Sequence, residues 1–259
     1  MTIAAMTQQL PRSNHAVAAY LDLMQRCLLN TIYEDAPMDY WSGGRFRAER
    51  RATGRDWPSQ AHTMIGMKRL VNLRTALETV IGENVPGDFI ETGVWRGGAC
   101  IMARAVLKAY GVTDRLVWVA DSFAGLPQPD PERYPADAGD KHHTFKQLAV
   151  SLDDVAGNFR KYDLLDHQVR FLKGWFKDTL PRAPIERLAV LRLDGDMYES
   201  TMDAFNALYD KVQPGGFVIV DDYQIASCRR AVADFRERRA IGDPIHDIDG
   251  FGVFWRRRG

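Results

Sequence analysis

Cysteine is scarce in this sequence. Its 259 residues include three cysteines, Cys27, Cys100 and Cys228, which lie far apart and form no CxxC pair. This spacing argues against a disulfide framework and against a zinc cage. We therefore expect buried, free thiols and a reducing compartment.

The chain also lacks a net charge and a long apolar run. Its 34 basic and 34 acidic residues cancel, so no overall field attracts nucleic acid or an anionic membrane. No stretch reaches the roughly 18 apolar residues of a membrane span, and the N-terminal MTIAAMTQQLPRSNH lacks the features of a signal peptide. We predict a cytoplasmic protein with a small-molecule partner, and the sequence leaves open whether it forms a homo-oligomer.

The hydrophobic residues are sufficient for a substantial core. They make up 46% of the chain, and its length suits one large α/β domain. We predict a single domain over residues 1–259, with a helical extension and lid over residues 1–85 and a Rossmann-like core over residues 86–259.

Two amphipathic helices are expected in the extension. Apolar residues recur at helical spacing in two sets, namely Val17, Tyr20, Leu21, Met24 and Leu28, and Met67, Leu70, Val71, Leu77 and Val80. Between the two sets, SGGRFRAERRATGRDWPS is polar and rich in arginine. This composition favours a mobile surface loop, either a linker or a lid over a site.

From residue 86 the pattern alternates between strands and helices. The expected strands are GDFIETGVW, RLVWVADSF, VRFLKGWF, LAVLRLDGD and GGFVIVDDY, and the expected helices are ACIMARAVLKAY, LDDVAGNFRKY, ESTMDAFNALYDKV and CRRAVADFRERRA. Such alternation predicts a doubly wound parallel sheet. PIHDID and GFGVFWRRR follow as a hairpin, which should close the sheet with an antiparallel edge.

Ligands of such sheets bind at the carboxyl ends of the strands. Here these ends are ETGVWRGG, ADSF, LDGD and VDDY. Gly93 allows a tight turn close to a ligand, but the spacing of the glycines is not GxGxxG, which weakens a dinucleotide interpretation. Glu91 suits a positively charged cofactor, and Asp121 is placed to accept hydrogen bonds from ribose hydroxyls. Together these residues suggest S-adenosylmethionine.

Six motifs in the same order carry a specific resemblance. TMIGMKRL, ETGVWRGGACI, WVADSFAGLP, GWFKDTLP, LDGDMY and GGFVIVDDY resemble the macrocin O-methyltransferase (TylF-like) family. The resemblance extends from about residue 15 onward. It implies a class I methyltransferase fold, an S-adenosylmethionine donor, a magnesium ion and methylation of deoxysugar hydroxyls in antibiotics.

The resemblance also implies roles for individual residues. Asp194, Asp221 and Asp222 are the implied metal ligands, and Asp196 is the implied general base. The implied cofactor contacts are Thr63, Met64, Glu91, Gly93, Asp121, Ser122 and, more weakly, Trp175.

Four aspartates at two strand ends also have a physical rationale. Carboxylate oxygens are the ligands that Mg²⁺ prefers. A sugar hydroxyl is a poor nucleophile, whereas a metal ion lowers the pKa of a bound water from about 15.7 to about 7. Asp196, two residues from a ligand, is placed to take the proton. Without the resemblance, Asp-Gly and Asp-Asp at strand ends are equally typical of turns.

His142 and His143 lie in PQPDPERYPADAGDKHHTF, which is too polar for a core. Histidines of exposed loops are usually inert, and the alternative is that His142 assists the base when the loop closes over substrate. We include His142 with Asp196 among the candidate catalytic residues.

The substrate prediction rests on PDPERYPADAGDKHH, which resembles aminocoumarin members of the family more than macrolide members. The implied acceptor is the 4-hydroxyl of noviose, and a macrolide deoxysugar is the alternative. Three other functions remain open: a nicotinamide-dependent oxidoreductase, a metal-dependent hydrolase and a non-catalytic ligand-binding protein.

Overall fold

A computed structural model describes residues 15–259 of the chain. Residues 1–14, on which the prediction about a signal peptide depends, lie outside the described part. Within that part, no helix combines the length and the apolar character needed to cross a membrane.

Seven strands form one sheet, in the order β3-β2-β1-β4-β5-β7-β6. Their bounds are β1 (Asp88–Thr92), β2 (Val117–Asp121), β3 (Val169–Lys173), β4 (Leu188–Leu193), β5 (Val212–Val220), β6 (His246–Asp247) and β7 (Val253–Arg256). The first five strands pair in parallel, whereas β7 pairs antiparallel with β5 and with β6. The predicted parallel sheet with an antiparallel C-terminal edge is confirmed.

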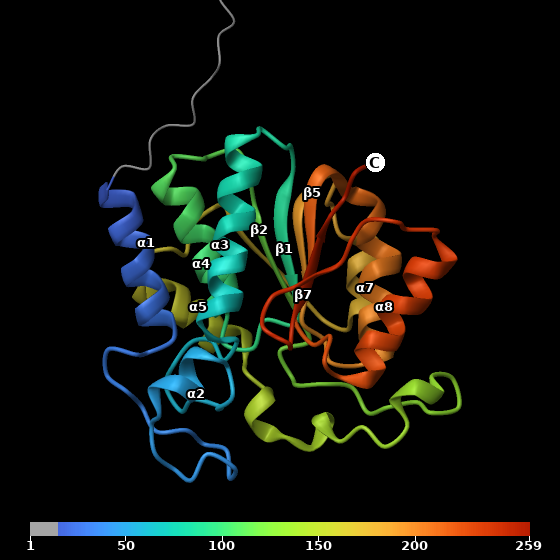
Figure 1. Cartoon of the computed structure of the whole chain (residues 1–259), viewed down its shortest axis with the longest axis horizontal. Helices are drawn as coiled ribbons and strands as arrows, with labels where there is room; N and C mark the ends of the chain where they lie inside the picture. Colours follow the sequence, from blue (N-terminus) through green and yellow to red (C-terminus); the bar gives the residue numbers. More distant parts are fainter. Residues whose placement is uncertain (1–14) are drawn as a thin grey trace, which may run out of the picture.

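Helices cover both faces of this sheet (Figure 1). The α-helices are α1 (His15–Leu28), α2 (Ala48–Ala52), α3 (Gly66–Gly82), α4 (Gly98–Ala109), α5 (Leu152–Lys161), α6 (Phe176–Thr179), α7 (Tyr198–Leu208) and α8 (Ala226–Arg238). Short 3₁₀ turns are η1 (Pro135–Asp137), η2 (His142–Thr144), η3 (Lys146–Leu148), η4 (Leu180–Arg182) and η5 (Tyr209–Lys211).

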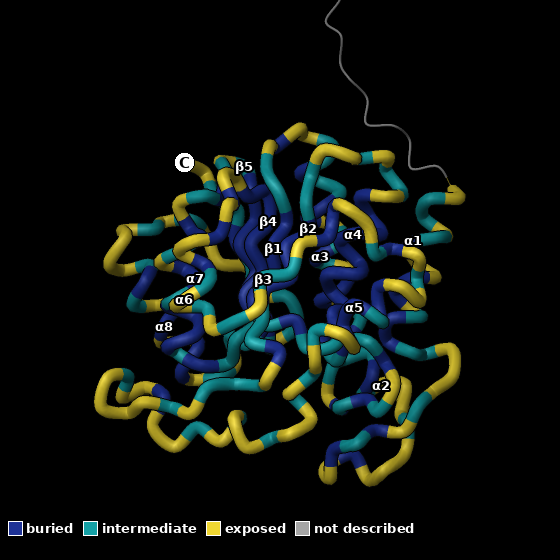
Figure 2. The backbone as a smooth tube through the Cα atoms, turned by 180° about the vertical axis from the view of Figure 1, so that it is seen from behind, coloured by how far each residue is buried: buried dark blue, intermediate teal, exposed yellow. Residues whose placement is uncertain are grey.

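Strand alternation explains the two layers of the core. Successive side chains of a strand point to opposite faces, so Phe89 of β1 joins the cluster under α1, α3 and α4, while Ile90 joins the cluster under α7 and α8. Both faces of the central strands are buried (Figure 2). Leu21 of α1 and Leu70 of α3 belong to the same cluster as Phe89. The N-terminal helices therefore share a core with the sheet, and the predicted division at residue 85 stays a prediction.

Several details differ from the sequence-based expectations. Val71 is 45% exposed, because it lies off the buried face of α3. The strand β5 begins at Val212, where a helix was expected, because Val212 pairs with Leu188 of β4. Cys100 and Cys228 are buried as expected, whereas Cys27 is half-buried.

The arginine-rich segment of residues 42–58 contains a packed and buried part, which its polar composition does not indicate. Arg51 of α2 is fully buried. Its guanidinium group donates to Asp35 Oδ1 (2.7 Å), to Asp56 Oδ2 (3.0 Å) and to the backbone oxygen of Leu29 (2.8 Å). Since a buried charge needs such partners, this network fixes the segment against α1. The expectation of a surface loop without a packed element was wrong for this part of the segment, and its mobility stays a prediction.

Replacing Arg51 with Met should destabilise the protein strongly. The substitution leaves Asp35 and Asp56 with uncompensated buried charge, which typically costs about 3 to 5 kcal/mol. Denaturant unfolding should show this loss in the free energy of unfolding. The exposed Arg47→Ala is the control and should stay within about 0.5 kcal/mol of the parent. A loss below about 1 kcal/mol for Arg51→Met would show that the network does not hold the segment.

Candidate active site

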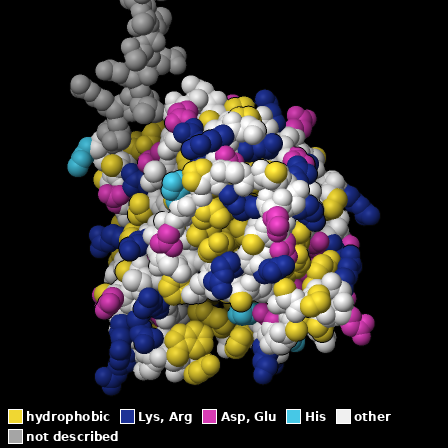
Figure 3. Space-filling model, turned by 45° about the vertical axis from the view of Figure 1, so that its right-hand side comes forward, with side chains coloured by type: hydrophobic (Ala, Val, Ile, Leu, Met, Phe, Trp, Pro, Cys, Tyr) yellow, Lys and Arg dark blue, Asp and Glu magenta, His cyan; other side chains and the backbone are white. Residues whose placement is uncertain are grey.

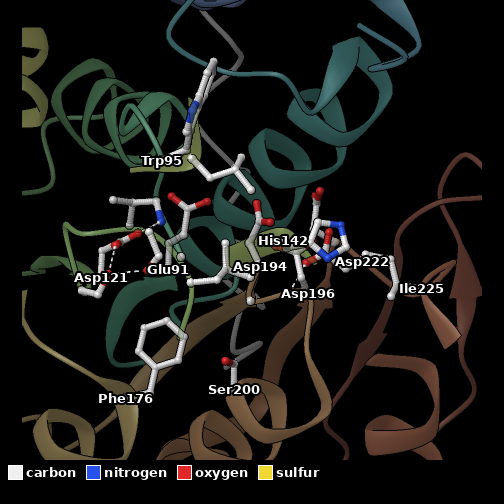
Figure 4. Close-up of a pocket in the computed structure, with 18 of the residues that line it drawn as sticks. Glu91, Trp95, Asp121, His142, Phe176, Asp194, Asp196, Ser200, Asp222 and Ile225 are labelled. Carbon is white, nitrogen blue, oxygen red and sulfur yellow. Dashed lines mark hydrogen bonds between the residues drawn. The ribbon is translucent and has the colours of Figure 1, made fainter. Parts of the chain in front are cut away.

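The candidate site lies where the strand order reverses, between β1 and β4. A single pocket at the carboxyl ends of β1, β2, β4 and β5 is lined by residues from all of these strand ends. Figure 4 shows Asp121 and Glu91 on one side, Asp194 in the middle, and Asp196, His142 and Asp222 on the other side. The structure thus brings the predicted cofactor and metal residues into one cavity.

The loop after β1 depends on glycine. Gly93 has a φ of 88°, and a Cβ there would collide with the backbone oxygen of Asp194. The backbone N–H of Asp194 in turn donates to Thr92 O at 2.9 Å. Gly98, at the start of α4, lies against the backbone oxygen of His62, where a Cβ would also collide. These contacts place the loop after β1 directly beside the acidic loop after β4.

Asp121 joins two loops at the other end of the pocket. Its Oδ2 accepts a hydrogen bond from Val94 N (2.8 Å), and its Oδ1 accepts one from Phe123 N (2.7 Å). Burial raises the pKa of Asp121, and these hydrogen bonds oppose the shift. Ser122 donates to Gly125 O at 2.6 Å. Asp121 therefore shapes the pocket wall, and its predicted contact with a ribose stays a prediction.

The remaining predicted cofactor residues also line the pocket. Thr63 is buried, Met64 lies beside it, and Trp175 is 39% exposed, just before α6. Trp175 was expected in a buried strand, but β3 ends at Lys173 and Gly174 has a φ of 138°. The contacts of these residues with the cofactor stay a prediction.

Arg192 is a buried cation that the sequence analysis missed. It is 1% exposed, and the parallel register places it beside Glu91. Its guanidinium group pairs with Glu91 and Asp221, and with Asp194 at 2.7 Å. Burial raises the pKa of Glu91 to about 7, although Arg192 opposes the shift. The Glu91 carboxylate also accepts a hydrogen bond from Cys100 Sγ (2.9 Å), so its charge is already partnered within the protein.

Asp194, Asp221 and Asp222 form a cluster that suits a metal ion. Their ligand oxygens lie within 4.8 Å of one another. Burial raises the pKa of Asp194 to about 6, with a further contribution from Asp221. Burial, together with the neighbouring carboxylates, raises the pKa of Asp222 well above its ordinary value.

Carboxyl groups outnumber guanidinium groups around this cluster. The carboxyl groups are those of Glu91, Asp194, Asp196, Asp221, Asp222 and Asp249, and the guanidinium groups are those of Arg69 and Arg192. Oxygen ligands with an excess of negative charge suit a hard divalent cation such as Mg²⁺. The donor set of the three clustered aspartates therefore fits this ion.

Asp196 is held beside the cluster in an unusual backbone conformation. Its φ is 57°, in the left-handed region, which aspartate tolerates better than most residues. Its backbone N–H donates to Asp222 Oδ2 (3.0 Å), and its backbone oxygen accepts from Ser227 Oγ (3.3 Å). Burial raises the pKa of Asp196 to about 7, while His142 opposes the shift.

His142 reaches the pocket because its loop is anchored. Its Nδ1 lies 2.7 Å from Asp140 Oδ2, and its backbone N–H donates to Asp140 Oδ1 (2.8 Å). Burial alone would lower the pKa of His142, but Asp196 and Asp140 raise it above its ordinary value. The neighbouring His143 is exposed and does not line the pocket.

Asp137 provides the anchor for this loop. It is 1% exposed, and its two carboxylate oxygens accept from Tyr198 N (2.6 Å) and Glu199 N (3.0 Å) at the start of α7. The loop was expected to be too polar for the core, and this expectation was wrong for Asp137. Carboxylates at helix N-termini are common partners of free backbone N–H groups, but the separation of 61 residues concealed this pairing.

Known proteins resemble this chain over nearly its whole length. Residues 17–257 match the family model Macrocin-O-methyltransferase (TylF). The 8-demethyl-8-(2,3-dimethoxy-alpha-L-rhamnosyl)-tetracenomycin-C 4'-O-methyltransferase of Streptomyces olivaceus is 57% identical, with 92% of each chain covered. The demethyldecarbamoylnovobiocin O-methyltransferase of Streptomyces niveus is 53% identical, with 98% of this chain and 99% of that protein covered.

Two solved structures share the fold of this chain. The O-methyltransferase NovP superposes with a TM-score of 0.90 at 54% identity, over 94% of this chain and 100% of that chain. The calicheamicin methyltransferase CalS11 shares the fold, with a TM-score of 0.60 at 16% identity, over 98% of this chain and 99% of that chain. The resemblance carried by the six motifs is confirmed. The chain belongs to the macrocin O-methyltransferase (TylF) family.

Proposed function

We propose that this O-methyltransferase methylates a deoxysugar hydroxyl of a glycosylated natural product and requires Mg²⁺. Membership of a methyltransferase family implies S-adenosylmethionine as the methyl donor. The observation that carries the proposal is the cluster of Asp194, Asp221 and Asp222, with Asp196 beside it. The same pocket is lined by Gly93 of the loop after β1. The oxidoreductase, hydrolase and non-catalytic alternatives do not agree with the family.

The acceptor is proposed from the relatives and from the loop that contains His142. The relatives are the tetracenomycin-C 4'-O-methyltransferase and the demethyldecarbamoylnovobiocin O-methyltransferase described above, and the mycinamicin III 3''-O-methyltransferase of Micromonospora griseorubida. The sequence identities to these three relatives are 57%, 53% and 53%, too similar to select one relative's acceptor for this chain. The 4-hydroxyl of noviose in an aminocoumarin is our first choice of acceptor, and a macrolide deoxysugar is the alternative. Methyl transfer to a panel of such glycosides tests the choice.

The proposed metal ligands are Asp194, Asp221 and Asp222. A bound Mg²⁺ would make the acceptor hydroxyl more acidic. Arg192 contacts Asp194 and Asp221, and Arg69 contacts Asp221. These guanidinium groups keep the ligand carboxylates in place by partly balancing their charge.

Asp196 is the proposed general base. Its carboxylate would accept the proton of the acceptor hydroxyl, and the hydrogen bonds of its backbone to Asp222 and Ser227 hold it in position. His142 is the proposed assistant, because Asp140 holds its Nδ1 and leaves Nε2 for the pocket. Asp140 thereby fixes the ring orientation, as a buried carboxylate does for a catalytic histidine in other enzymes.

The cofactor is proposed to lie over the loops after β1 and β2. Thr63, Met64, Glu91, Gly93, Asp121, Ser122 and Trp175 line that side of the pocket. Three free cysteines agree with the proposed cytoplasmic location. We propose neither a nucleic acid nor a membrane as a partner.

Asp196→Asn and Asp222→Asn should respond differently to magnesium. Asn at position 196 cannot accept a proton at neutral pH, so turnover should fall by about 10² to 10⁴ and stay low when Mg²⁺ is raised. Asn at position 222 retains an oxygen for the Asp196 N–H but weakens the metal site, so raised Mg²⁺ should restore part of the turnover. Turnover at saturating cofactor, titrated with Mg²⁺, measures both effects.

Calorimetric binding of S-adenosylhomocysteine is the control for both variants and should be nearly unchanged. Near-normal turnover of Asp196→Asn at saturating Mg²⁺ would remove Asp196 from the role of base. The next variant would then be His142→Gln.

Stabilisation by Mg²⁺ should be larger at pH 8 than at pH 5.5. The folded pKa values of Asp194 (about 6) and Asp196 (about 7) lie above the value of about 4 for an unfolded chain. Their contribution to the free energy of unfolding is complete below about pH 4 and is lost as the pH rises through 6 to 7. Mg²⁺ at about 100 times its Kd should raise Tm by roughly 5 to 10 °C at pH 8. The rise should be smaller at pH 5.5, where protons compete for the ligands.

Thermal unfolding with and without Mg²⁺ at each pH measures this difference. The Tm with Mg²⁺ is compared with the Tm without Mg²⁺ at the same pH. This comparison cancels the contribution to stability of groups outside the metal cluster, such as His62, whose pKa is lowered to about 4 by burial. Asp222→Asn should lose most of the shift. Equal shifts at the two pH values would mean that the carboxylates do not exchange protons for metal.

Asp121→Ala should weaken binding of S-adenosylmethionine by tenfold or more. The substitution would remove the proposed charge-assisted hydrogen bonds to ribose, each worth about 1.5 to 3 kcal/mol. It also releases the backbone N–H groups of Val94 and Phe123, so Asp121→Asn is the matched variant with an acceptor oxygen retained. Calorimetry measures the affinity, and an unchanged Kd for Asp121→Ala would contradict the assignment.

A further inference from the structure

A row of four aromatic rings leads from the pocket to the outside of the molecule. We call Tyr40, Trp41, Trp57 and Phe145 the aromatic row. The ring centroids of Tyr40 and Trp41 are 5.0 Å apart, those of Trp41 and Trp57 are 5.2 Å apart, and those of Trp57 and Phe145 are 5.3 Å apart, all edge-to-face. Phe145 lies 6.1 Å from the ring of His142. Since Trp57 and His142 both line the pocket, the row starts at the proposed catalytic side.

The outer end of the row is exposed yet firmly held. Tyr40 is 86% exposed and Trp41 is 41% exposed. The buried Asp39 accepts hydrogen bonds from Ser42 N and Trp57 N, both at 2.7 Å. The loop that carries Trp41 is therefore tied to Trp57. Exposed apolar surface at a fixed position beside a pocket is typical of a binding site, because little freedom is lost when a ligand docks.

Cationic groups flank the aromatic row. The Arg50 guanidinium donates to Trp41 O (3.4 Å), and Arg55 lies 5.5 Å from the ring of Phe251, which lines the pocket. Figure 3 shows hydrophobic side chains gathered near the lower edge of the molecule, with Lys and Arg side chains nearby. Residues 31–58 and 127–145 occupy this same lower edge in Figure 1. Arginine beside exposed rings favours a ligand with an electron-rich aromatic face.

We propose that the aromatic row binds the aglycone of the acceptor glycoside and that this aglycone is a flat aromatic ring system. The inference rests on the proposed function. A sugar whose hydroxyl meets Asp196 has its reacting end beside His142, so the rest of the glycoside extends outward past Phe145 and Trp57. Edge-to-face rings offer both faces and edges to a flat ligand, and such ring contacts add to the effect of apolar burial alone. A saturated aglycone would gain only the free energy of apolar burial, without the ring contacts.

Three rhamnosides test this inference by calorimetric binding to the full chain with S-adenosylhomocysteine and Mg²⁺. They are 4-methylumbelliferyl, cyclohexyl and methyl α-L-rhamnoside, which share a 6-deoxyhexose and differ in the aglycone. The flat coumarin glycoside should bind about tenfold more tightly than the methyl glycoside, and the cyclohexyl glycoside should lie between them.

Alanine variants locate the effect on the row. Trp41→Ala and Tyr40→Ala should each weaken binding of the coumarin glycoside, by about tenfold for Trp41, and leave binding of the methyl glycoside unchanged. Tyr33→Ala is the matched control, because Tyr33 is 85% exposed and has no ring partner within the described residues. Unchanged Tm values would show that the variants fold, and Trp41→Phe should recover part of the affinity.

Several results would overturn the inference. They are absent binding of the coumarin glycoside, equal affinity for the coumarin and cyclohexyl glycosides, and equal effects of Trp41→Ala and Tyr33→Ala. A change of molar mass in light scattering for Trp41→Ala would assign the row to contact between two copies of the chain. These results concern binding and molar mass, whereas the proposed function is tested by methyl transfer. If the proposed function is wrong, no rhamnoside or antibiotic glycoside is methylated, whatever its affinity.

Discussion

The buried guanidinium group of Arg192 is the interaction on which the rest of the site depends. It lies inside β4 with Glu91, Asp194 and Asp221 around it. Without this cation, three carboxyl groups at neighbouring strand ends would repel one another in a region from which water is largely excluded, and their negative forms would be strongly disfavoured. Arg69 extends the same balance to Asp221 and Asp249. The guanidinium groups of Arg192 and Arg69 thus neutralise part of the charge of the acidic cluster. The charge that remains faces the pocket.

Sequence patterns were sufficient for the architecture because periodicity and strand-end chemistry are local properties. The run LAVLRLDGD predicts a buried strand with aspartates at its end, and the structure contains β4 followed by Asp194 and Asp196. The partners of buried ions are not local. Arg69 and Asp221 are 152 residues apart in sequence, so neither segment indicates the pair. An arginine within an apolar strand was the one available signal for Arg192, since such a charge needs a buried partner.

Polarity was a poor guide to packing in the two segments that border the pocket. Residues 42–58 and 127–145 both have the composition of surface loops, yet each contains buried charged side chains. Arg51 and Asp56 pair with each other in the first segment, and Asp137 caps α7 from the second. Trp57 and Phe145 then bring the two segments into contact. A buried and paired aspartate or arginine cannot be distinguished in a sequence from a solvated one, because the residue type is the same and only the fold determines its partners.

The collision that any side chain at Gly93 would make with the Asp194 carbonyl has a consequence for redesign of the enzyme. The loop after β1 and the loop after β4, which carries Asp194 and Asp196, touch through their backbones, so neither can be rebuilt without displacing the other. New acceptor preferences are therefore difficult to introduce at the strand ends. The two bordering segments carry no such constraint at their exposed tips, and they are the places where an engineer should diversify the sequence first.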